Sequence, residues 1–391
     1  MLTFLRNADV FAPHPLGKSD LLVAGGRILA IAPTLPGAPP GFVAEERDLG
    51  GRRLIPGLID GHVHVTGGGG ESGPASRVPP ITLTQLSRAG ITSVVGVLGT
   101  DSTTRNITEL VARTLGLREE GLSAWCWTGS YECPPKTLTS SVRSDIAFID
   151  PVLGVGELAI SDHRSSQPTL DELLRIAADC HVAGLLSGKA GVLHLHLGDG
   201  KRGLELVRQA LELSEIPARV FHPTHVNRNK RLFEEAKQMA KDHRMTIDVT
   251  AFPADDDGYT ADAAIARCLA DPDFPAERLT VSSDGAGCLP VFDGDGRLVE
   301  MDIGRPRALI ETLAALLARG LELERVLPVF TSNVADLLRL SNKGRIAVGL
   351  DADLVVLSAS HEPVDVMARG RWLVRDGAPT AFGTFEKAAR H

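Results

Sequence analysis

Five side chains of types that commonly bind metal ions follow apolar runs of this sequence. Two of them, His62 and His64, flank Val63 in the tripeptide HVH and therefore point to the same side of an extended chain. The other three are His196, His225 and Asp284. Four imidazoles and a carboxylate suit zinc or a similar divalent ion. A single histidine is more often a hydrogen-bonded core or loop residue, so the prediction of a metal site depends on the whole set.

A sixth side chain, Glu157, interrupts an apolar run in the stretch VLGVGELAISD. An ionised carboxylate in a protein core is costly unless it is paired or bound to a metal. The sequence therefore predicts that Glu157 faces either a metal ion or a basic partner. Arg164 is the nearest such partner in the sequence.

Eight apolar runs ending in polar clusters alternate with stretches whose apolar residues recur at helical spacing. The runs cover residues 58–66, 91–101, 122–131, 152–162, 191–199, 219–226, 245–252 and 278–287. Such an alternation predicts an α/β fold, a (β/α)8 TIM-type barrel. Active sites of these barrels lie at the C-terminal ends of the strands, which is where the metal-binding side chains occur. Thr169 and Glu172 resemble a capping box at the start of one predicted helix.

The two ends of the chain have a different pattern, in which short apolar runs are separated by turns rich in glycine. This pattern predicts short strands joined by hairpins in 21–33, 46–57, 344–358 and 363–379. Neither end is long enough to form a stable domain alone, so we expect both to build one small β-domain. The predicted boundaries are 1–56 and 344–391 for the two parts of this domain and 57–343 for the barrel.

Composition argues against several classes of partner. The chain has 49 acidic residues against 41 Lys and Arg, a formal net charge of −8, and no dense basic run, so we expect no nucleic-acid partner. The N-terminus has no long apolar segment after a basic start, so we expect neither a signal peptide nor a membrane partner. Five cysteines without a CxxC pair indicate neither a disulfide framework nor a Cys-type zinc site, and a cytoplasmic location is the default.

Longer motifs resemble those of the amidohydrolase superfamily and, within it, those of isoaspartyl (β-aspartyl) dipeptidases. They are GHVHVTGGGGESGP, GITSVVGVLGTDS, ISDHRS, PTHVNRN and SSDGAG, and the resemblance covers most of the chain. It implies a barrel hydrolase with a small β-domain built from both termini, acting in the cytosol on dipeptides linked through an aspartate side chain. Because members of this family form homo-oligomers, self-association is also expected.

The resemblance assigns the predicted ligands to two divalent metal ions per subunit, with zinc as the expected metal. It implies that His62, His64 and Asp284 hold one ion, and that His196 and His225 hold the other. A hydroxide between the metals then attacks the amide, while Asp284 takes the proton and delivers it to the leaving amine.

A carboxylate from the fourth strand bridges the two metals in this family, and in its better-known members this bridge is a lysine carrying CO2. Counted back from the motif ISDH, Glu157 takes the place of that lysine. Counted forward from the GV that begins GVGELAISDH, Gly156 takes its place, because this chain has one more residue between the two motifs. Glutamate keeps the charge but is shorter, so the extra residue is predicted to bulge the strand toward the metals. The alternative is that Glu157 is a salt-bridged acid beside the ligands. Lys189, a rival for the carbamylated bridge, precedes the fifth strand at its bottom end.

The resemblance also implies residues that bind the substrate. Glu71 follows the glycine run 67–70 and matches a residue that binds the free α-amino group; the glycines permit close backbone approach and can offer N–H groups to a carboxylate. Thr100 is a candidate donor to a carboxylate. Arg164 and Arg228 match arginines that hold the two carboxylates of the dipeptide, and which arginine meets which carboxylate is left open.

Two more residues complete the predicted site. Tyr131 matches a tyrosine that stabilises the oxyanion, although a tyrosine after a strand often only packs. Cys288 stands where the family has a serine, and its thiol is the weaker donor, which puts that contact in doubt. His194 lies further inside the fifth strand than His196 and is predicted to pack or to support a ligand.

Other functions remain open at this stage. One is another amidohydrolase, such as a dihydroorotase, a hydantoinase or an N-acyl-amino-acid hydrolase. Glu71 favours the dipeptidase, because it supplies a partner for a free amine. The other is a barrel that kept the fold as a non-catalytic scaffold, against which the intact set of histidines and Asp284 argues.

Overall fold

The computed structural model describes residues 2–253, 257–292 and 297–386 of the 391-residue chain. Within these residues, eight parallel strands form the barrel wall, and the eight predicted strand positions are confirmed. They are β6 (Leu58–Val63), β7 (Ile91–Gly96), β8 (Ser123–Thr128), β9 (Val152–Ile160), β10 (Val192–Leu197), β11 (Phe221–Thr224), β12 (Ile247–Thr250) and β13 (Leu279–Ser282).

The strands pair in chain order around the barrel. β6 to β11 form one sheet and β12 pairs with β13. Two backbone hydrogen bonds close the ring: Val226 N–H donates to the Asp248 carbonyl (3.3 Å), and His64 N–H donates to the Gly285 carbonyl (2.9 Å). The predicted (β/α)8 fold is thus confirmed, and the C-terminal ends of all these strands open on one side.

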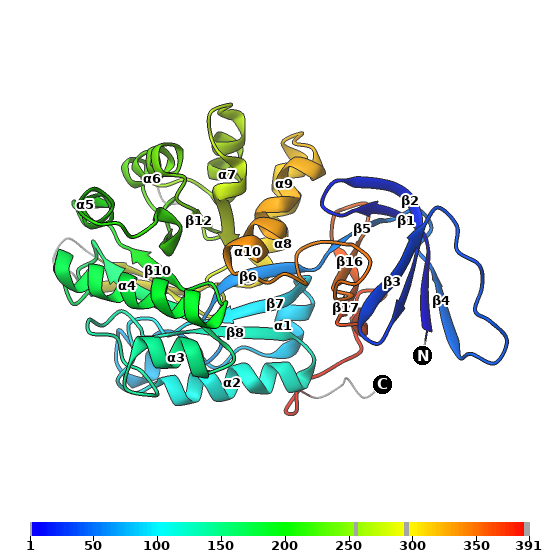
Figure 1. Cartoon of the computed structure of the whole chain (residues 1–391), viewed down its shortest axis with the longest axis horizontal. Helices are drawn as coiled ribbons and strands as arrows, with labels where there is room; N and C mark the ends of the chain where they lie inside the picture. The colour runs from blue at the N-terminus through cyan, green and yellow to red at the C-terminus, as the bar shows by residue number, and fades with distance from the viewer. Residues whose placement is uncertain (1, 254–256, 293–296, 387–391) are drawn as a thin grey trace.

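Helices surround this sheet, as Figure 1 shows for the α1–α4 face and the α5–α9 face. Their bounds are α1 (Leu83–Ser87), α2 (Ile107–Glu120), α3 (Val142–Phe148), α4 (Leu170–Ser187), α5 (Glu205–Leu213), α6 (Lys230–His243), α7 (Ala261–Ala270), α8 (Arg307–Ala318), α9 (Leu323–Phe330) and α10 (Ser332–Leu337). The predicted capping box at Thr169 and Glu172 begins α4. No helix among the described residues is both long and apolar enough to cross a membrane.

Strands from both ends of the chain form a nine-stranded sheet beside the barrel (Figure 1, blue and red). They are β1 (Leu2–Phe11), β2 (Pro15–Ala24), β3 (Arg27–Ala32), β4 (Ala44–Asp48), β5 (Arg53–Pro56), β16 (Leu354–Leu357), β17 (Pro363–Ala368), β18 (Arg371–Arg375) and β19 (Ala378–Pro379). The two ends meet where β5 pairs with β16. This sheet has a hydrophobic core of its own, which includes Leu5, Leu21 and Met367. The domain boundaries themselves stay a prediction.

Two of the predicted hairpins are wrong. In 46–57, β4 and β5 do not pair with each other, because both pair in parallel with β1, β4 along Leu2–Arg6 and β5 along Asp9–Val10. In 344–358 only β16 is a strand, because the backbone before it bonds to Ile28 instead: Gly349 N–H donates to the Ile28 carbonyl at 2.8 Å, and Ile28 N–H donates to the Leu350 carbonyl at 2.9 Å. Apolar periodicity indicates a strand but not its partner.

One hairpin beside the barrel mouth was not predicted. β14 (Cys288–Phe292) and β15 (Leu298–Ile303) pair in antiparallel fashion directly after the barrel strand β13. The hairpin contributes Cys288 and Leu289 to the wall of the cavity described below.

Candidate active site

The structure brings the six predicted metal-binding side chains together at the C-terminal ends of the barrel strands. They are His62, His64, Glu157, His196, His225 and Asp284, and each is at most 6% exposed. His225 is the first residue after β11, and Asp284 is the second residue after β13. Their backbone φ angles are 61° and 51°. Residues other than glycine seldom adopt this left-handed backbone, and it turns both side chains toward the barrel axis.

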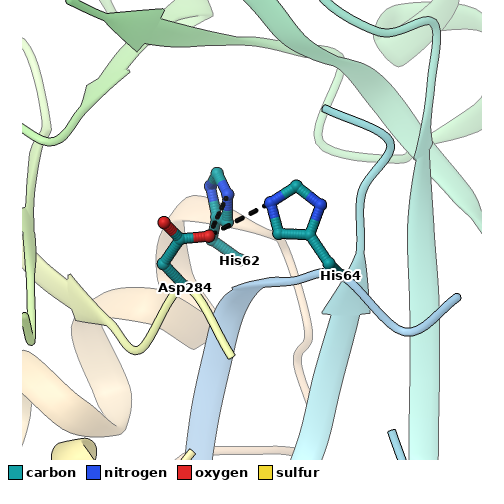
Figure 2. Close-up of side chains that lie close together, drawn as sticks. All are labelled: His62, His64 and Asp284. Carbon is teal, nitrogen blue, oxygen red and sulfur yellow. Dashed lines mark ion pairs between the residues drawn. The ribbon is translucent and has the colours of Figure 1, made fainter. Parts of the chain in front are cut away.

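Figure 2 shows His62, His64 and Asp284 pointing toward one another. Asp284 Oδ1 lies 3.1 Å from His64 Nε2 and 3.4 Å from His62 Nε2. His62 Nε2 and Asp284 Oδ1 are buried and have no hydrogen-bond partner. Buried polar atoms are normally satisfied, so these two call for a ligand that binds lone pairs, such as a metal ion.

Glu157 divides its two carboxylate oxygens between two pairs of histidines. Its Oε1 lies 3.5 Å from Nε2 of both His62 and His64. Its Oε2 lies 3.1 Å from His196 Nδ1 and 3.4 Å from His225 Nε2. The carboxylate is therefore central to the cluster, whereas Arg164 pairs with Asp162 at 2.8 Å.

The predicted bulge in β9 is present. Between β9 and β10, three steps from Val155 to Leu158 face two steps from Leu193 to Leu195, so one extra residue lies on the β9 side. Gly156 is required there, because a Cβ at this position would lie 2.8 Å from the Cβ of His194. The bulge places Glu157 inside the barrel mouth.

Electrostatics make the cluster attractive to cations. Burial would lower the pKa of His62, but the carboxylates of Glu157 and Asp284 outweigh it and hold this pKa well above its ordinary value. Burial would raise the pKa of Glu157, yet His62 and His196 hold it well below its usual range. Imidazole nitrogens and carboxylate oxygens are also the donors that zinc prefers, so the residues fit a divalent ion.

His196 has further partners that sequence reasoning did not identify in full. The Tyr131 hydroxyl lies 2.7 Å from His196 Nδ1, which places Tyr131 beside the metal-binding cluster. On the other side of the ring, Nε2 lies 2.9 Å from Asp162 Oδ2. Asp162 also accepts hydrogen bonds from Arg164 at 2.8 and 3.0 Å. The signal for Asp162 was its place in ISDHRS, where only Arg164 was singled out.

A cavity of about 720 Å³ opens above the cluster. It is lined by the six predicted substrate-binding residues Glu71, Thr100, Tyr131, Arg164, Arg228 and Cys288. Glu71 Oε1 lies 3.6 Å from Arg164, whereas its Oε2 is buried without a hydrogen-bond partner. Arg228 pairs with Asp199 at 3.4 Å. Burial raises the pKa of the Cys288 thiol to about 12, so Cys288 remains protonated and uncharged.

The glycine run permits close packing, but two of its N–H groups are not available to a substrate. A Cβ on Gly67 would lie 1.9 Å from the Val78 carbonyl oxygen, so this position requires glycine. Gly67 N–H donates to the His64 carbonyl at 2.7 Å, and Gly68 N–H donates to the Ala286 carbonyl at 2.8 Å. The prediction that the run 67–70 offers N–H groups to a carboxylate is therefore wrong for Gly67 and Gly68, because the loop uses these two amides to hold itself.

Two remaining predictions concern residues outside the cluster. Lys189 Nζ donates to the carbonyls of Ile146 and Ile149 at 2.7 Å each, remote from the metal-binding side chains, as expected for the bottom of β10. His194 stacks on Trp127 and places its Nε2 2.8 Å from His62 Nδ1. It therefore both packs and supports His62.

The chain matches known proteins over most of its length. A model of the family described as "Amidohydrolase family" matches residues 53–373. The crystal structure of a β-aspartyl dipeptidase from Fervidobacterium islandicum AW-1 in complex with the β-Asp-Leu dipeptide is 43% identical, with a TM-score of 0.94 and 99% of each chain covered. A second crystal structure of a β-aspartyl dipeptidase from that organism is 41% identical, with a TM-score of 0.90, covering 99% of this chain and 100% of the other.

Curated relatives are more distant. A dihydroorotase from Anaplasma phagocytophilum is 26% identical in an alignment of 385 positions that covers 88% of this chain and 83% of that protein. Two allantoinases from Desulfitobacterium hafniense are 38% and 40% identical over 60 residues, and this chain spans only 12% of their length.

Proposed function

Because the chain belongs to the amidohydrolase family, we propose that this hydrolytic enzyme is a metal-dependent β-aspartyl dipeptidase. It would hydrolyse the amide that joins the side chain of an aspartate to the next residue. The observation that carries the proposal is Glu71, whose Oε2 is buried in the cavity without a partner. A free ammonium group satisfies such an oxygen, and the N-terminus of a dipeptide provides one. The likeness to a β-aspartyl dipeptidase crystallised with β-Asp-Leu supports this assignment.

We propose two divalent ions per subunit, with zinc as the metal. His62, His64 and Asp284 would hold one ion, as their converging ligand atoms suggest. His196 and His225 would hold the other. When bound, the ions supply Lewis acidity and a nucleophile formed from water at neutral pH.

Glu157 is the proposed bridge between the two ions, because its oxygens are shared between the two histidine pairs. Among sets of side chains whose ligand atoms all lie within 4.8 Å of one another, Glu157 belongs with His62 and His225, and His196 is not included. We place His196 at the second ion because its Nδ1 lies 3.1 Å from Glu157 Oε2.

Asp284 is the proposed general base and acid. A carboxylate has two acceptor oxygens, so Asp284 would accept a proton from the attacking water and pass it to the leaving amine while one of its oxygens holds the first ion. Tyr131 would donate a hydrogen bond from its hydroxyl to the amide oxygen as negative charge develops there. Its hydroxyl lies 2.7 Å from His196 Nδ1, which supports a place for it beside the proposed second ion.

The cavity would select the linkage by holding both ends of the aspartyl unit. Glu71 would bind the α-ammonium group, Arg164 and Arg228 the two carboxylates, and Thr100 would donate to a carboxylate. The Cys288 thiol adds at most a weak contact. Only the side-chain carbonyl would then reach Asp284, and a misplacement of about 1 Å costs about a hundredfold in rate.

A hydrolysis panel of β-Asp-Leu, α-Asp-Leu, dihydroorotate and N-acetyl-amino acids tests the proposal. We expect β-Asp-Leu to be cleaved at least about a hundredfold faster than α-Asp-Leu, its isomer of identical composition. Equal rates for the two isomers would contradict the assignment. Dihydroorotate as the best substrate would instead favour the activity named for the relative from Anaplasma phagocytophilum.

We also propose, from the family resemblance alone, that the protein acts in the cytoplasm as a homo-oligomer on a small dipeptide. Light scattering coupled to size-exclusion chromatography tests the assembly, and a mass equal to the 41.5 kDa of one chain would contradict it.

A further inference from the structure

A chain of hydrogen bonds runs from His62 into the barrel interior and ends at Asp248. We propose that this chain, which passes through His194, His222 and Thr280, determines which nitrogen of His62 carries its proton. It thereby presents the other nitrogen, Nε2, to the metal. The proposal rests on the metal site of the proposed function but not on the identity of the substrate.

The chain is continuous and buried. It joins His62 Nδ1 to His194 Nε2 (2.8 Å), His194 Nδ1 to His222 Nδ1 (2.9 Å), His222 Nε2 to Thr280 Oγ1 (3.1 Å) and Thr280 Oγ1 to Asp248 Oδ1 (2.7 Å). Each member is at most 3% exposed. The side chains come from β6, β10, β11, β13 and β12, so the chain crosses the barrel interior beneath the metal-binding cluster.

Its direction is set at the far end. A carboxylate offers only acceptor sites, and Asp248 accepts hydrogen bonds from the hydroxyls of Thr280, Thr224 and Ser282. Within the part of the chain that the structure describes, the other partner of Thr280 Oγ1 is the Ile247 carbonyl at 3.3 Å, which is also an acceptor. The Thr280 proton therefore points to Asp248 or Ile247, and its oxygen can only accept from the imidazole above it.

This direction passes through each imidazole in turn. A neutral imidazole has one N–H and one lone pair, and burial lowers the pKa of His222 to about 4, so His222 is neutral near pH 7. Since His222 donates from Nε2, its Nδ1 must accept from His194 Nδ1–H. His194 Nε2 then accepts from His62 Nδ1–H, so His62 keeps its proton on Nδ1 when a metal ion displaces the proton from Nε2, the nitrogen that faces Asp284.

Packing holds the chain in this arrangement. Trp127 stacks on His194 with ring centroids 5.2 Å apart and an interplanar angle of 16°. Gly156 packs against both residues, since a Cβ on it would lie 2.8 Å from the Cβ of His194 and 3.2 Å from Cγ of Trp127. The ring of His194 therefore has a fixed position from which to receive the His62 proton. A metal-bound histidine commonly donates its second N–H to a carboxylate or a carbonyl, which fixes its orientation. In this chain of hydrogen bonds, two imidazoles and a hydroxyl lie between His62 and the carboxylate of Asp248.

The first test needs no variant. Protein labelled with 15N at histidine reports through two-bond imidazole couplings which nitrogen of each ring is protonated. We expect a single tautomer for each interior histidine, with His194 protonated at Nδ1 and His222 at Nε2. His194 protonated at Nε2, or His222 at Nδ1, would reverse the direction of the chain and overturn the proposal.

The second test interrupts the chain far from the metal. Thr280→Val keeps the shape but removes the hydroxyl, and Thr280→Ser is the matched control that keeps it. We expect Thr280→Val to lower the affinity for Zn2+, measured by competition with a chelator, by roughly 10- to 100-fold. Its His222 should become a mixture of tautomers, whereas Thr280→Ser should behave like the wild type. Wild-type affinity in folded Thr280→Val would overturn the proposal.

A third variant serves if Thr280→Val does not fold. Asp248→Asn keeps the size of the side chain, but its amide can donate to Thr280 and so permits the opposite direction. We expect mixed tautomers and weaker Zn2+ binding, and an unchanged protein would overturn the proposal. Wild-type protein that binds no Zn2+ would contradict the proposed function itself, whereas tight binding with reversed tautomers would contradict only this inference.

Discussion

Two clusters of buried charge lie at opposite ends of the barrel, and they differ in how far they satisfy themselves. At the C-terminal ends of the strands, Glu157 and Asp284 face four histidines. Three buried atoms of that cluster, His62 Nε2, His64 Nδ1 and Asp284 Oδ1, have no hydrogen-bond partner. It is incomplete as it stands.

The second cluster lies where the N-terminal end of β8 meets the β-domain. Lys343, only 3% exposed, contacts Ser123 Oγ at 2.6 Å, Asp353 at 2.5 Å and Asp351 at 2.8 Å. An ammonium group has three donors, and all three are used. The carboxylates are also satisfied, since Asp353 accepts from the Arg369 amide and Asp351 accepts from Asn342.

The difference separates structure from function. A buried charge cluster that completes its own hydrogen bonds joins parts of the fold, here Ser123 of the barrel and Asp353 of the β-domain. A buried charge cluster whose nitrogen and oxygen atoms lack hydrogen-bond partners at the mouth of a cavity requires a ligand. Each cluster should therefore respond to mutation in its own way, one in metal content and turnover and the other in stability.

The largest expected effect comes from removing the centre of the incomplete cluster. In Glu157→Ala two cations would be left close together without a shared anion, so we expect metal content to fall and turnover to reach background. Metal analysis of the purified variant and a β-Asp-Leu assay measure both quantities. Glu157→Gln, which keeps the size but not the charge, is the matched control and should also lose metal. Normal metal content in Glu157→Ala would make Glu157 only a neighbour of the ligands.

Asp284→Asn should separate chemistry from metal binding. The amide cannot accept the proton, and general acid–base groups contribute about 10²- to 10⁴-fold, so we expect kcat to fall within that range. At least one metal should remain, because His196, His225 and Glu157 are intact. Metal analysis alongside steady-state kinetics tests this, and wild-type turnover in Asp284→Asn would assign the proton transfer to another group.

Lys343→Met tests the complete cluster. The variant would leave Asp351 and Asp353 without their cation, and breaking a buried ion pair typically costs about 3–5 kcal/mol of unfolding free energy. Arg345→Met, which breaks an exposed pair with Asp336, is the control and should cost about 1 kcal/mol or less. Urea unfolding measures both. Loss of Zn2+ affinity in folded Lys343→Met would break the comparison, because it would couple the two clusters.

Much of the site was predictable because its ligands occur at strand ends. The spacing of His62 and His64, and the apolar runs before His196 and His225, identify the barrel mouth without a structure. The bulge at Glu157 was predictable as well, since one extra residue has to be accommodated somewhere in the strand.

Other features depend on contacts between strands that a single sequence does not contain. His222 and Asp248 lie inside β11 and β12, where nothing in their spacing marks them as partners of His62 through His194. The pairing of β4 and β5 with β1 was missed for the same reason. Periodicity determines which face of a strand is buried, but neighbours across the sheet determine what a buried polar group meets.

Tyr131→Phe should have a smaller effect than either carboxylate variant. Removing one oxyanion donor costs about 10²- to 10³-fold in kcat, and we expect the lower end, because a metal ion would share the task. The contact grows in the transition state, so kcat should fall more than KM rises. Steady-state kinetics on β-Asp-Leu separate the two constants. A variant at full speed would show that Tyr131 only packs against His196.

The last prediction concerns how the metal-binding cluster is assembled, and it expects bicarbonate to have no effect. A lysine bridge must first react with CO2, so metal uptake by such a site depends on bicarbonate. Glu157 already carries its carboxylate. We therefore expect metal-free protein given Zn2+ in CO2-depleted buffer to recover full activity, with no gain from added bicarbonate.

Glu157→Lys is the matched variant for this experiment. β9 carries one extra residue at this point, and we expect it to move the backbone at residue 157 inward. A longer carbamylated side chain would then reach past the metals, and bicarbonate should not restore activity. Deleting Gly156 in that variant would remove the extra residue and should improve the response to bicarbonate. If wild-type reconstitution itself requires bicarbonate, a lysine must take part, and Glu157 cannot be the only anion shared by the two ions.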